Sequence, residues 1–332
     1  MKAVIWRKPG DLEVADNAPD PRPGAADLLV EVAVCGVCGT DLHIADGEFP
    51  PTPYPIIPGH ELSGTVVEVG AEAPKGWHPG DRVAVDPSLY CGHCPACRAG
   101  RGNLCADWNA IGDTVNGAFA QYVAVPAVNA YRLSDSIGFQ EAALVEPLAC
   151  AIHGMRQIGD VLGRDVVVMG AGTMGLLLGQ LLARAGASGV SFVDRKPDRL
   201  EAARSLGATA TATDISQLDG HFSVAVDATG AAPAIEAAFG RLDRGGILLV
   251  FGVAPAEATV ALSPFRIYND EIRVVGSMAV LNSFGDAVDL LEAGAVQTGP
   301  LLSTPLGLSE FPEALDRVRR GEGIKVQVAP NQ

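Results

Sequence analysis

The sequence predicts an α/β protein with two folded domains, a mostly antiparallel β domain and a doubly wound parallel sheet. The chain has 332 residues, of which 48% are hydrophobic, and this is enough to bury two separate cores. Short β-type runs fill the first part, whereas strands and helices alternate in the second. We expect residues 1–150 and 298–332 to form the first domain and residues 151–297 to form the second.

The first part of the chain carries short β-type runs separated by Gly and Pro. These runs lie at residues 28–34, 62–69, 82–85 and 120–125. Such spacing is typical of an irregular, mostly antiparallel β domain, whose loops can carry a functional site. An apolar stretch with helical spacing at residues 139–157 then predicts one helix that leads out of this domain.

The second part alternates between buried strands and helices. Strands are predicted at 165–169, 190–193, 223–226, 246–251 and 272–275, with helices to about residue 185 and over 197–206. This alternation implies a parallel sheet with right-handed crossovers. Residues 301–328 leave this rhythm, so we expect them to return to the first domain.

A glycine-rich loop follows the first strand of the parallel sheet and reads Gly170-Ala-Gly172-Thr173-Met174-Gly175. In the fingerprint of dinucleotide-binding loops, the first glycine permits a tight turn and the second lets the backbone approach a pyrophosphate. The third lets the helix pack against the strand. A purely structural turn is the alternative interpretation, but the strand before the loop and the helix after it favour a nucleotide site.

The next strand ends on Asp194, where a carboxylate can accept hydrogen bonds from both ribose hydroxyls and repel a 2′-phosphate. Asp194 therefore favours NAD over NADP. Arg195 and Arg199 follow closely and could relax that preference.

Four cysteines lie close together in the first domain, separated by two, two and seven residues: Cys91, Cys94, Cys97 and Cys105. Closely spaced thiolates with intervening Gly and Pro can surround a tetrahedral ion, and four of them leave no position open for a substrate. We therefore predict a structural zinc in a lobe of residues 88–108. An iron–sulfur cluster and scattered free thiols are the alternatives, and His93 is expected to be a solvated bystander.

Charge and composition limit the class of partner. The formal net charge of −15 disfavours nucleic acid and anionic membrane surfaces, which are bound through clustered Lys and Arg. The sequence shows no long uncharged apolar run, so we expect no membrane span. Five of the seven cysteines occur at two-residue spacings, which indicates metal or thiol chemistry in a reducing compartment, most simply the cytoplasm.

Further motifs complete a recognisable set: Cys38-Gly-Thr-Asp-Leu-His43, Gly59-His60-Glu61, Gly80-Asp-Arg-Val83 and Glu146-Pro-Leu-Ala-Cys-Ala-Ile-His153. Together with the cysteine lobe and the glycine loop, they make the chain resemble the zinc-containing medium-chain dehydrogenase/reductase family, or zinc alcohol dehydrogenase superfamily. The match is closest to its polyol, sorbitol and threonine dehydrogenase branch and covers nearly the whole length. The resemblance implies a GroES-like catalytic domain beside a Rossmann domain.

The resemblance also implies a catalytic zinc held by Cys38 and His60, with Glu61 and Glu146 as direct or water-linked further ligands. Thiolate, imidazole and carboxylate are all zinc donors. Thr40 and His43 match the family's proton relay, in which a proton passes from the alcohol to Thr40, through the cofactor ribose to His43, and out to solvent. Asp41 is expected to orient His60.

Other positions follow from the same resemblance. Thr173, Met174, Val253, Ser277 and Met278 are expected to line the cofactor pocket. Lys325 is expected either to contact the cofactor pyrophosphate or to be a solvated lysine. Cys35 is expected to be a small buried hydrophobic residue, and the role of Cys150 stays open. We expect substrate contacts from three loops, residues 46–54, 108–119 and 280–284. Their residue types do not indicate which substrate is bound.

The leading functional prediction is a zinc-dependent oxidoreductase that transfers a hydride between NAD and a secondary alcohol and gives the ketone. Polyols, sugars or cyclitols, and amino alcohols are the candidate substrate classes, with two zinc ions per chain. One alternative is an NADPH-dependent carbonyl reductase of the same family. Another is a nucleotide-binding sensor that has lost catalysis. A homodimer or homotetramer is expected from the family.

Overall fold

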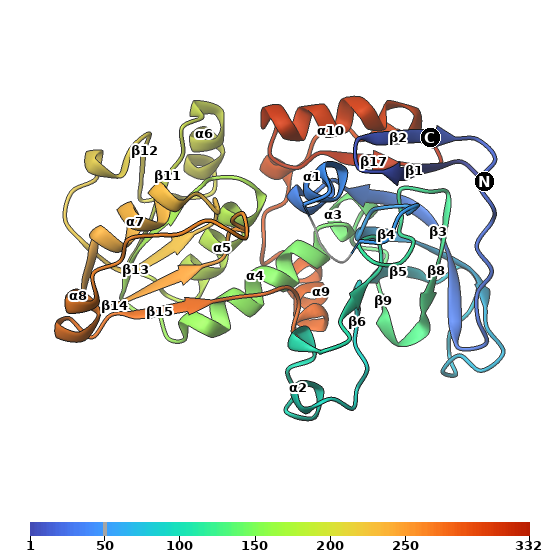
Figure 1. Ribbon diagram of the computed structural model, residues 1–332, viewed down its shortest axis with the longest axis horizontal. Helices are drawn as coiled ribbons and strands as arrows, with labels where there is room; N and C mark the ends of the chain where they lie inside the picture. Colours follow the sequence, from blue (N-terminus) through green and yellow to red (C-terminus); the bar gives the residue numbers. More distant parts are fainter. Residues whose placement is uncertain (49–51) are drawn as a thin grey trace. The chain divides into compact units, whose positions relative to one another are not determined.

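The computed structural model describes residues 1–48 and 52–332, and it divides into two compact units (Figure 1). Unit 1 comprises Met1–Ala149, Val280–Ala295 and Leu302–Gln332, and unit 2 comprises Cys150–Ala279 and Val296–Leu301. The sequence-based boundaries assign Val280–Ala295 to the second domain, whereas the structure groups this segment with unit 1. Residues 49–51, part of one expected substrate loop, lie outside the described residues.

The main sheet of unit 1 has seven strands and is antiparallel except for its β16–β17 pair. The order is β16-β17-β3-β4-β5-β9, with β8 paired to β3. These strands are β3 (Asp27–Gly36), β4 (Glu61–Val69), β5 (Arg82–Val85), β8 (Tyr122–Pro126), β9 (Ala130–Arg132), β16 (Leu306–Gly307) and β17 (Gln327–Ala329). The predicted irregular β domain of GroES-like type is confirmed.

The C-terminal segment joins this sheet, because β17 pairs with the end of β3 through Gln327 opposite Gly36. Buried residues of the sheet form one core with the C-terminal helix. In this core the rings of Phe119 and Phe311 lie 4.6 Å apart. The C-terminal residues therefore contribute both backbone hydrogen bonds and apolar packing to unit 1.

Smaller elements of unit 1 surround this sheet. The strands are the hairpin β1 (Ala3–Lys8) and β2 (Asp11–Ala15) and the pair β6 (Ser88–Leu89) and β7 (Asn109–Ala110). The helices are α1 (Gly39–Asp46), α2 (Pro95–Arg98), α3 (Phe139–Ala142), α9 (Phe284–Glu292) and α10 (Phe311–Arg320). Short 3₁₀ turns are η1 (Gly102–Leu104), η2 (Ala127–Asn129) and η5 (Leu308–Glu310).

The single helix predicted over residues 139–157 is instead two helices, α3 and α4 (Val145–Ile158). Pro147 explains the interruption. Proline lacks an N–H and its ring clashes with the carbonyl four residues earlier, so it is tolerated in the first turn of a helix and not in the interior. A new helix therefore begins just before Pro147, and Glu146 falls in its first turn.

Unit 2 holds a six-stranded parallel sheet in the order β12-β11-β10-β13-β14-β15. The strands are β10 (Asp165–Met169), β11 (Gly189–Val193), β12 (Ala210–Ala212), β13 (Phe222–Asp227), β14 (Leu242–Val250) and β15 (Arg273–Gly276). This is the 3-2-1-4-5-6 order of a Rossmann fold, so the predicted doubly wound domain is confirmed. Among these strands, only β12 has no counterpart in the sequence-based prediction.

The helices of unit 2 are α5 (Thr173–Arg184), α6 (Pro197–Ser205), α7 (Ala232–Gly240) and α8 (Pro264–Asn269), with 3₁₀ turns η3 (Ile215–Gln217) and η4 (Gly299–Leu301). Helix α5 packs closely on β10 and β11, because a side chain at Gly179 would meet the ring of Phe192 at 2.2 Å. The strand order reverses beside β10, and this is where doubly wound folds bind nucleotides. Within the described residues, no helix has the length and apolar character that crossing a bilayer requires.

Candidate active site

The start of helix α1 places a thiol and a hydroxyl on one turn. Cys38 directly precedes the helix, and its backbone N–H donates to Asp41 Oδ2 at 2.8 Å, which caps the first turn. Cys38 Sγ then lies 3.8 Å from Thr40 Oγ1. The first predicted zinc ligand and the first member of the predicted relay are therefore neighbours.

Cys38, His60 and Glu61 form a compact donor cluster in unit 1. One ligand atom from each residue lies within 4.8 Å of the others. His60 is 5% exposed and Glu61 is 1% exposed, at the start of β4. One thiolate, one imidazole and one carboxylate form a donor set that suits zinc and leaves a fourth position open. Glu146 is buried but lies outside this compact cluster.

Lys325 is the counter-charge of this cluster. Its Nζ forms an ion pair with Glu61 Oε2 and donates a hydrogen bond to the Val37 carbonyl at 3.1 Å. Burial alone would lower the pKa of Lys325, but the negative charges of Glu61, Cys38 and Glu146 outweigh it and raise the pKa. The expected alternative of a solvated lysine is wrong, because Lys325 is only 3% exposed.

A glycine makes room for this ion pair. Gly36 lies opposite Glu61 in the β3–β4 ladder. A Cβ atom at Gly36 would lie 2.0 Å from Glu61 Oε2 and 2.6 Å from Lys325 Cε. Any side chain at this position would therefore push the two charged groups apart.

His60 is held by a carboxylate that sequence reasoning did not assign. Its Nδ1 lies 3.1 Å from Oδ1 of Asp113, and both side chains are buried. Burial lowers the pKa of His60, but the charge and hydrogen bonding of Asp113 outweigh this and raise it. Asp41, which was expected to orient His60, instead accepts the Cys38 N–H, and burial raises its pKa to about 7.

His43 lies at the other end of α1, where Glu48 is its partner. His43 Nδ1 is 3.0 Å from Glu48 Oε2, and the Glu48 N–H donates to the His43 carbonyl at 2.8 Å. The His43 side chain is 30% exposed and that of Glu48 is 63% exposed. The predicted relay histidine thus lies at the edge of unit 1 with access to solvent.

Cys35 and Cys38 do not act as a pair. Cys35 is fully buried, and burial raises the pKa of its thiol well above the ordinary value. Both residues are free thiols. Cys35 packs beneath the segment that carries His60, since a Cβ at Gly59 would meet its sulfur at 3.0 Å. It therefore behaves as the small buried hydrophobic residue that the sequence led us to expect.

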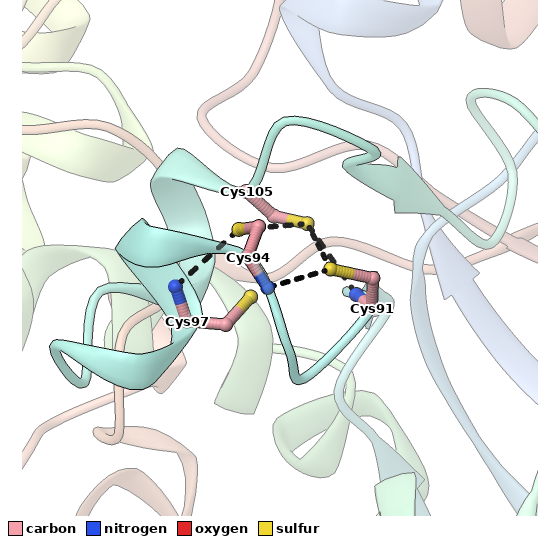
Figure 2. Close-up of side chains that lie close together, drawn as sticks. All are labelled: Cys91, Cys94, Cys97 and Cys105. Atoms are coloured by element: carbon pink, nitrogen blue, oxygen red, sulfur yellow. Dashed lines mark hydrogen bonds between the residues drawn. The ribbon is translucent and has the colours of Figure 1, made fainter.

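The four-cysteine lobe is assembled around α2. Cys91, Cys94, Cys97 and Cys105 place their sulfur atoms within 4.8 Å of one another, and Figure 2 shows the four side chains turned inward. Backbone N–H groups of Cys91 and Asp107 both donate to Cys105 Sγ at 3.3 Å. Four convergent thiols with N–H donors could hold a zinc ion in a closed site.

The thiols of this lobe are not equivalent in the absence of a metal. Backbone hydrogen bonds from Cys97 and Ala106 lower the pKa of Cys94 to about 6, whereas desolvation and the neighbouring sulfurs raise the pKa of Cys97 to about 12. His93 is exposed and its Nδ1 lies 2.9 Å from the Cys91 carbonyl. The four cysteine sulfurs provide four metal donors without His93.

In unit 2, the glycine loop closes on the carboxyl end of β10. Gly170 has φ +98°, and a Cβ at Gly175 would lie 1.9 Å from the Gly170 carbonyl, so both positions need glycine. A Cβ at Gly172 would meet only Arg199, at 3.7 Å. The backbone at Gly172 is therefore open to a ligand, while Gly170 and Gly175 serve the turn and the helix packing.

Asp194 directly follows β11 and is hydrogen-bonded to this loop. Its Oδ2 accepts the Ala171 N–H at 2.8 Å, and its Oδ1 accepts the Lys196 N–H at 2.9 Å. Arg199 Nη1 lies 3.8 Å from Asp194 Oδ2, while Arg195 is exposed. The carboxylate thus has a fixed position beside the predicted phosphate-binding turn.

The other predicted cofactor positions also lie in unit 2. Thr173 and Met174 begin α5, and both are partly buried. Val253 is 68% exposed and Met278 is 42% exposed, while Ser277 Oγ is buried without a hydrogen-bond partner among the described residues. These five positions combine apolar side chains with two hydroxyl groups, those of Thr173 and Ser277.

Asp227 is a structural residue that sequence reasoning missed. It is fully buried at the end of β13, and its carboxylate accepts the N–H groups of Thr229 and Gly230 at 3.0 and 3.1 Å. This turn lies against the glycine loop, since a Cβ at Gly170 would meet Thr229 Cγ2 at 2.9 Å. The sequence Asp227-Ala-Thr-Gly230 after a strand was the available signal.

Comparisons with known proteins agree with this arrangement. Residues 24–135 match the model of the alcohol dehydrogenase GroES-like domain, and residues 173–293 match that of zinc-binding dehydrogenases. D-arabinitol dehydrogenase 1 of Uromyces fabae is 36% identical over 344 residues, which cover 100% of this chain and 97% of the relative. D-altritol 5-dehydrogenase of Agrobacterium fabrum is 36% identical over 319 residues, 94% of each chain.

A solved structure is also similar over the full length. A Sinorhizobium meliloti protein bound to NADP has a TM-score of 0.94 and 36% identity and covers 99% of each chain. The two matched domains, the donor cluster and the glycine loop together define a zinc-binding, NAD(P)-dependent oxidoreductase. The chain belongs to the zinc-containing medium-chain dehydrogenase family.

Proposed function

We propose that the protein oxidises a secondary hydroxyl of a polyol or a related sugar alcohol to the ketone, with NAD as the hydride acceptor. The single observation that carries this proposal is the convergence of Cys38, His60 and Glu61 within 4.8 Å, next to the Thr40 hydroxyl. The polyol class draws support from the two relatives named for arabinitol and altritol. Sugars, cyclitols and amino alcohols are the neighbouring classes.

The chain's own residues have distinct tasks in this proposal. Cys38, His60 and Glu61 would hold the catalytic zinc, with Glu146 as a further oxygen donor. When bound, zinc supplies a Lewis acid for the substrate oxygen and NAD supplies the hydride acceptor. Thr40 is the first acceptor of the hydroxyl proton.

His43 is the next member of the relay and hands the proton to solvent. Glu48 is the hydrogen-bond partner of the His43 ring, and the side chain is 30% exposed, which gives it access to solvent. A neutral histidine takes up a proton at one ring nitrogen and can release one at the other, so it can pass a proton on without net change. Substitution of Thr40 or His43 should therefore slow turnover while leaving zinc binding intact.

NAD is proposed over NADP on the basis of Asp194. Its carboxylate is held by two backbone N–H groups beside the glycine loop. A carboxylate in this position accepts hydrogen bonds from the ribose hydroxyls and repels a 2′-phosphate. Arg195 and Arg199 act in the opposite direction, and the similar Sinorhizobium meliloti protein was solved with NADP. Comparison of kcat/KM for the two cofactors decides between them.

Two zinc ions per chain are proposed, because two separate donor clusters are present. One is the mixed cluster of Cys38, His60 and Glu61, and the other is the four-cysteine lobe. A closed thiolate site holds zinc structurally, whereas a mixed site with an open position serves catalysis. Elemental analysis of the purified protein should give close to two zinc ions per chain.

A steady-state panel tests the proposed function. Pentitols, hexitols, inositols, amino alcohols and simple primary alcohols are each supplied with NAD and with NADP, and reduced cofactor is followed by absorbance. We expect turnover to be highest with a secondary hydroxyl of a polyol and with NAD. Turnover confined to NADPH and a carbonyl compound would instead support the reductase.

A homo-oligomer located in the cytoplasm is also proposed. Strand β15 is one edge of the six-stranded sheet, and large apolar side chains at Phe265, Tyr268 and Val274 are exposed on or near it. An exposed apolar sheet edge favours pairing with a second chain, here a second copy. The cytoplasm keeps cysteines reduced, as zinc ligation requires. Light scattering should give a mass of at least two chains.

A further inference from the structure

We propose that Asp113 is a positioning residue for the catalytic zinc, because it fixes the ring orientation and tautomer of His60. This inference rests on the proposed zinc site of Cys38, His60 and Glu61. It assigns a new residue to that site, from a loop that sequence analysis placed only among the substrate contacts.

The first observation is the contact itself. Asp113 Oδ1 lies 3.1 Å from His60 Nδ1, with Asp113 6% exposed and His60 5% exposed. Neither atom has a hydrogen bond to any other group within the described residues. A buried carboxylate that faces a buried ring nitrogen without competition is well placed to hold the proton on that nitrogen.

The second observation is that the fold holds the Asp113 loop against the His60 segment. The N–H groups of Gly117, Ala118 and Phe119 donate to the carbonyls of Ile57, Gly59 and Pro58 at 2.7, 2.9 and 2.9 Å, respectively. The Asn116 side chain accepts the Ile57 N–H at 3.0 Å. The segment that follows Asp113 is thus tied to the residues just before His60 by three backbone hydrogen bonds and one side-chain hydrogen bond.

Glycines permit this close approach. A Cβ at Gly112 or at Gly117 would lie 2.3 Å from the Gly59 carbonyl oxygen, and Gly59 itself has φ +105°. Thr114 closes the turn, because its Oγ1 accepts the Ala110 N–H at 2.9 Å. The position of Asp113 is therefore determined by main-chain packing.

The chemical consequence concerns the two nitrogens of His60. With the proton held on Nδ1 by Asp113, Nε2 keeps its lone pair and can serve as a metal donor beside Cys38. Asp41 Oδ2 instead accepts the Cys38 N–H, and among the described residues it is Asp113 whose carboxylate forms an ion pair with His60. The two carboxylates therefore have different roles. Asp41 caps the start of α1, and Asp113 orients the ring of His60.

The test measures zinc release to a colorimetric chelator from the full-length protein. It compares the wild type with Asp113→Asn, Asp113→Ala, Asp41→Asn and Cys38→Ser. In the wild type, we expect one faster and one slower zinc ion, and Cys38→Ser should lack the faster one. Asp113→Ala should accelerate only the faster release, by about 10–100-fold. Asp113→Asn should have a smaller effect in the same direction, because its amide oxygen still accepts a hydrogen bond.

The four-cysteine lobe is the internal control. A general structural defect would change its release rate too, whereas loss of a positioning residue should leave it unchanged. Wild-type release from both Asp113 variants, or equal acceleration of both zinc ions, would overturn the role of Asp113. If Cys38→Ser kept the same zinc content as the wild type, the proposed zinc site itself would be wrong, and the role of Asp113 with it.

Discussion

Lys325 and Glu61 form a buried ion pair at the donor cluster. The Lys325 side chain is 4% exposed, that of Glu61 is 1% exposed, and Lys325 Nζ also donates to the Val37 carbonyl. The pair links the C-terminal segment to the start of β4. It also places a positive charge close to the carboxylate of the proposed zinc site, so a bound zinc ion and Lys325 would share Glu61 as a partner.

Replacement of Lys325 by methionine should lower the free energy of unfolding. The substitution leaves the Glu61 carboxylate buried without a counter-charge, which typically costs about 3–5 kcal/mol. Urea unfolding of zinc-stripped protein measures the change, since zinc would otherwise replace the lost positive charge. Lys8→Met removes an exposed lysine and is the matched control. Equal stability of the two variants would contradict the account of this ion pair.

The pH dependence of the stability that Lys325 contributes follows from the direction in which its pKa is shifted. The pKa of Lys325 is raised in the folded protein, despite the opposing effect of burial. The stabilisation is therefore fully present below the ordinary lysine pKa and is lost only as the pH rises through the raised value. Urea unfolding of the wild type at a series of pH values should therefore show no loss of stability from Lys325 titration near neutral pH.

Gly36→Ala should destabilise unit 1. Its Cβ would lie 2.0 Å from Glu61 Oε2, so either the ion pair or the β3–β4 ladder must shift. Overpacking of this kind typically costs about 1–3 kcal/mol. Gly240→Ala is the control, because nothing lies within 4 Å of a Cβ there and Gly240 ends a helix. Chemical denaturation should give a lower midpoint for Gly36→Ala alone; two unchanged midpoints would refute this packing argument.

The cysteine lobe should lose its zinc independently of the mixed cluster. Cys97→Ser removes one of four convergent sulfurs and should reduce zinc content by one ion per chain, leaving the ion that depends on Cys38. Limited proteolysis should then cleave within residues 91–105, because their fold depends on the metal. Full zinc content with an intact lobe would show that the four thiols are not a zinc site.

Asp194→Ser should shift cofactor preference toward NADP. The substitution removes the charge that repels a 2′-phosphate and leaves Arg195 and Arg199 in place. A hydrogen bond to a charged group is worth about 1.5–3 kcal/mol, so kcat/KM with NAD should fall by about tenfold or more. Asp198→Ser, an exposed change on α6, is the control. An unchanged ratio of kcat/KM for the two cofactors would exclude Asp194 as the discriminating residue.

The sequence predicted the parallel sheet well because its central strands, β10, β11 and β13, are largely buried and so appear as continuous apolar runs. The bounds of β10 matched their prediction, and Asp194 directly follows β11. The break between α3 and α4 was missed although Pro147 signalled it. In these regions, the determining interactions are local along the chain.

The residues that were misassigned depend on tertiary packing instead. A lysine such as Lys325 has the same local signature whether it is solvated or buried, and only its approach to Glu61 distinguishes the two. Asp113 lies far from His60 in the sequence, and glycines in two separate loops bring the residues together. The spacing of residues along the chain does not predict such contacts. The sequence motif therefore pointed to Asp41, which is nearer in the sequence, as the residue that orients His60.

The most direct test of the proposed function compares wild type, Cys38→Ser and Cys35→Ala with the best polyol found in the panel. Cys38→Ser removes a ligand of the proposed catalytic zinc, whereas Cys35→Ala changes a neighbouring buried thiol outside the donor cluster. Formation of reduced cofactor is the measurement. The account predicts that turnover falls to the enzyme-free background in Cys38→Ser and persists in Cys35→Ala. Wild-type turnover by Cys38→Ser would contradict a zinc-dependent dehydrogenase built on this cluster.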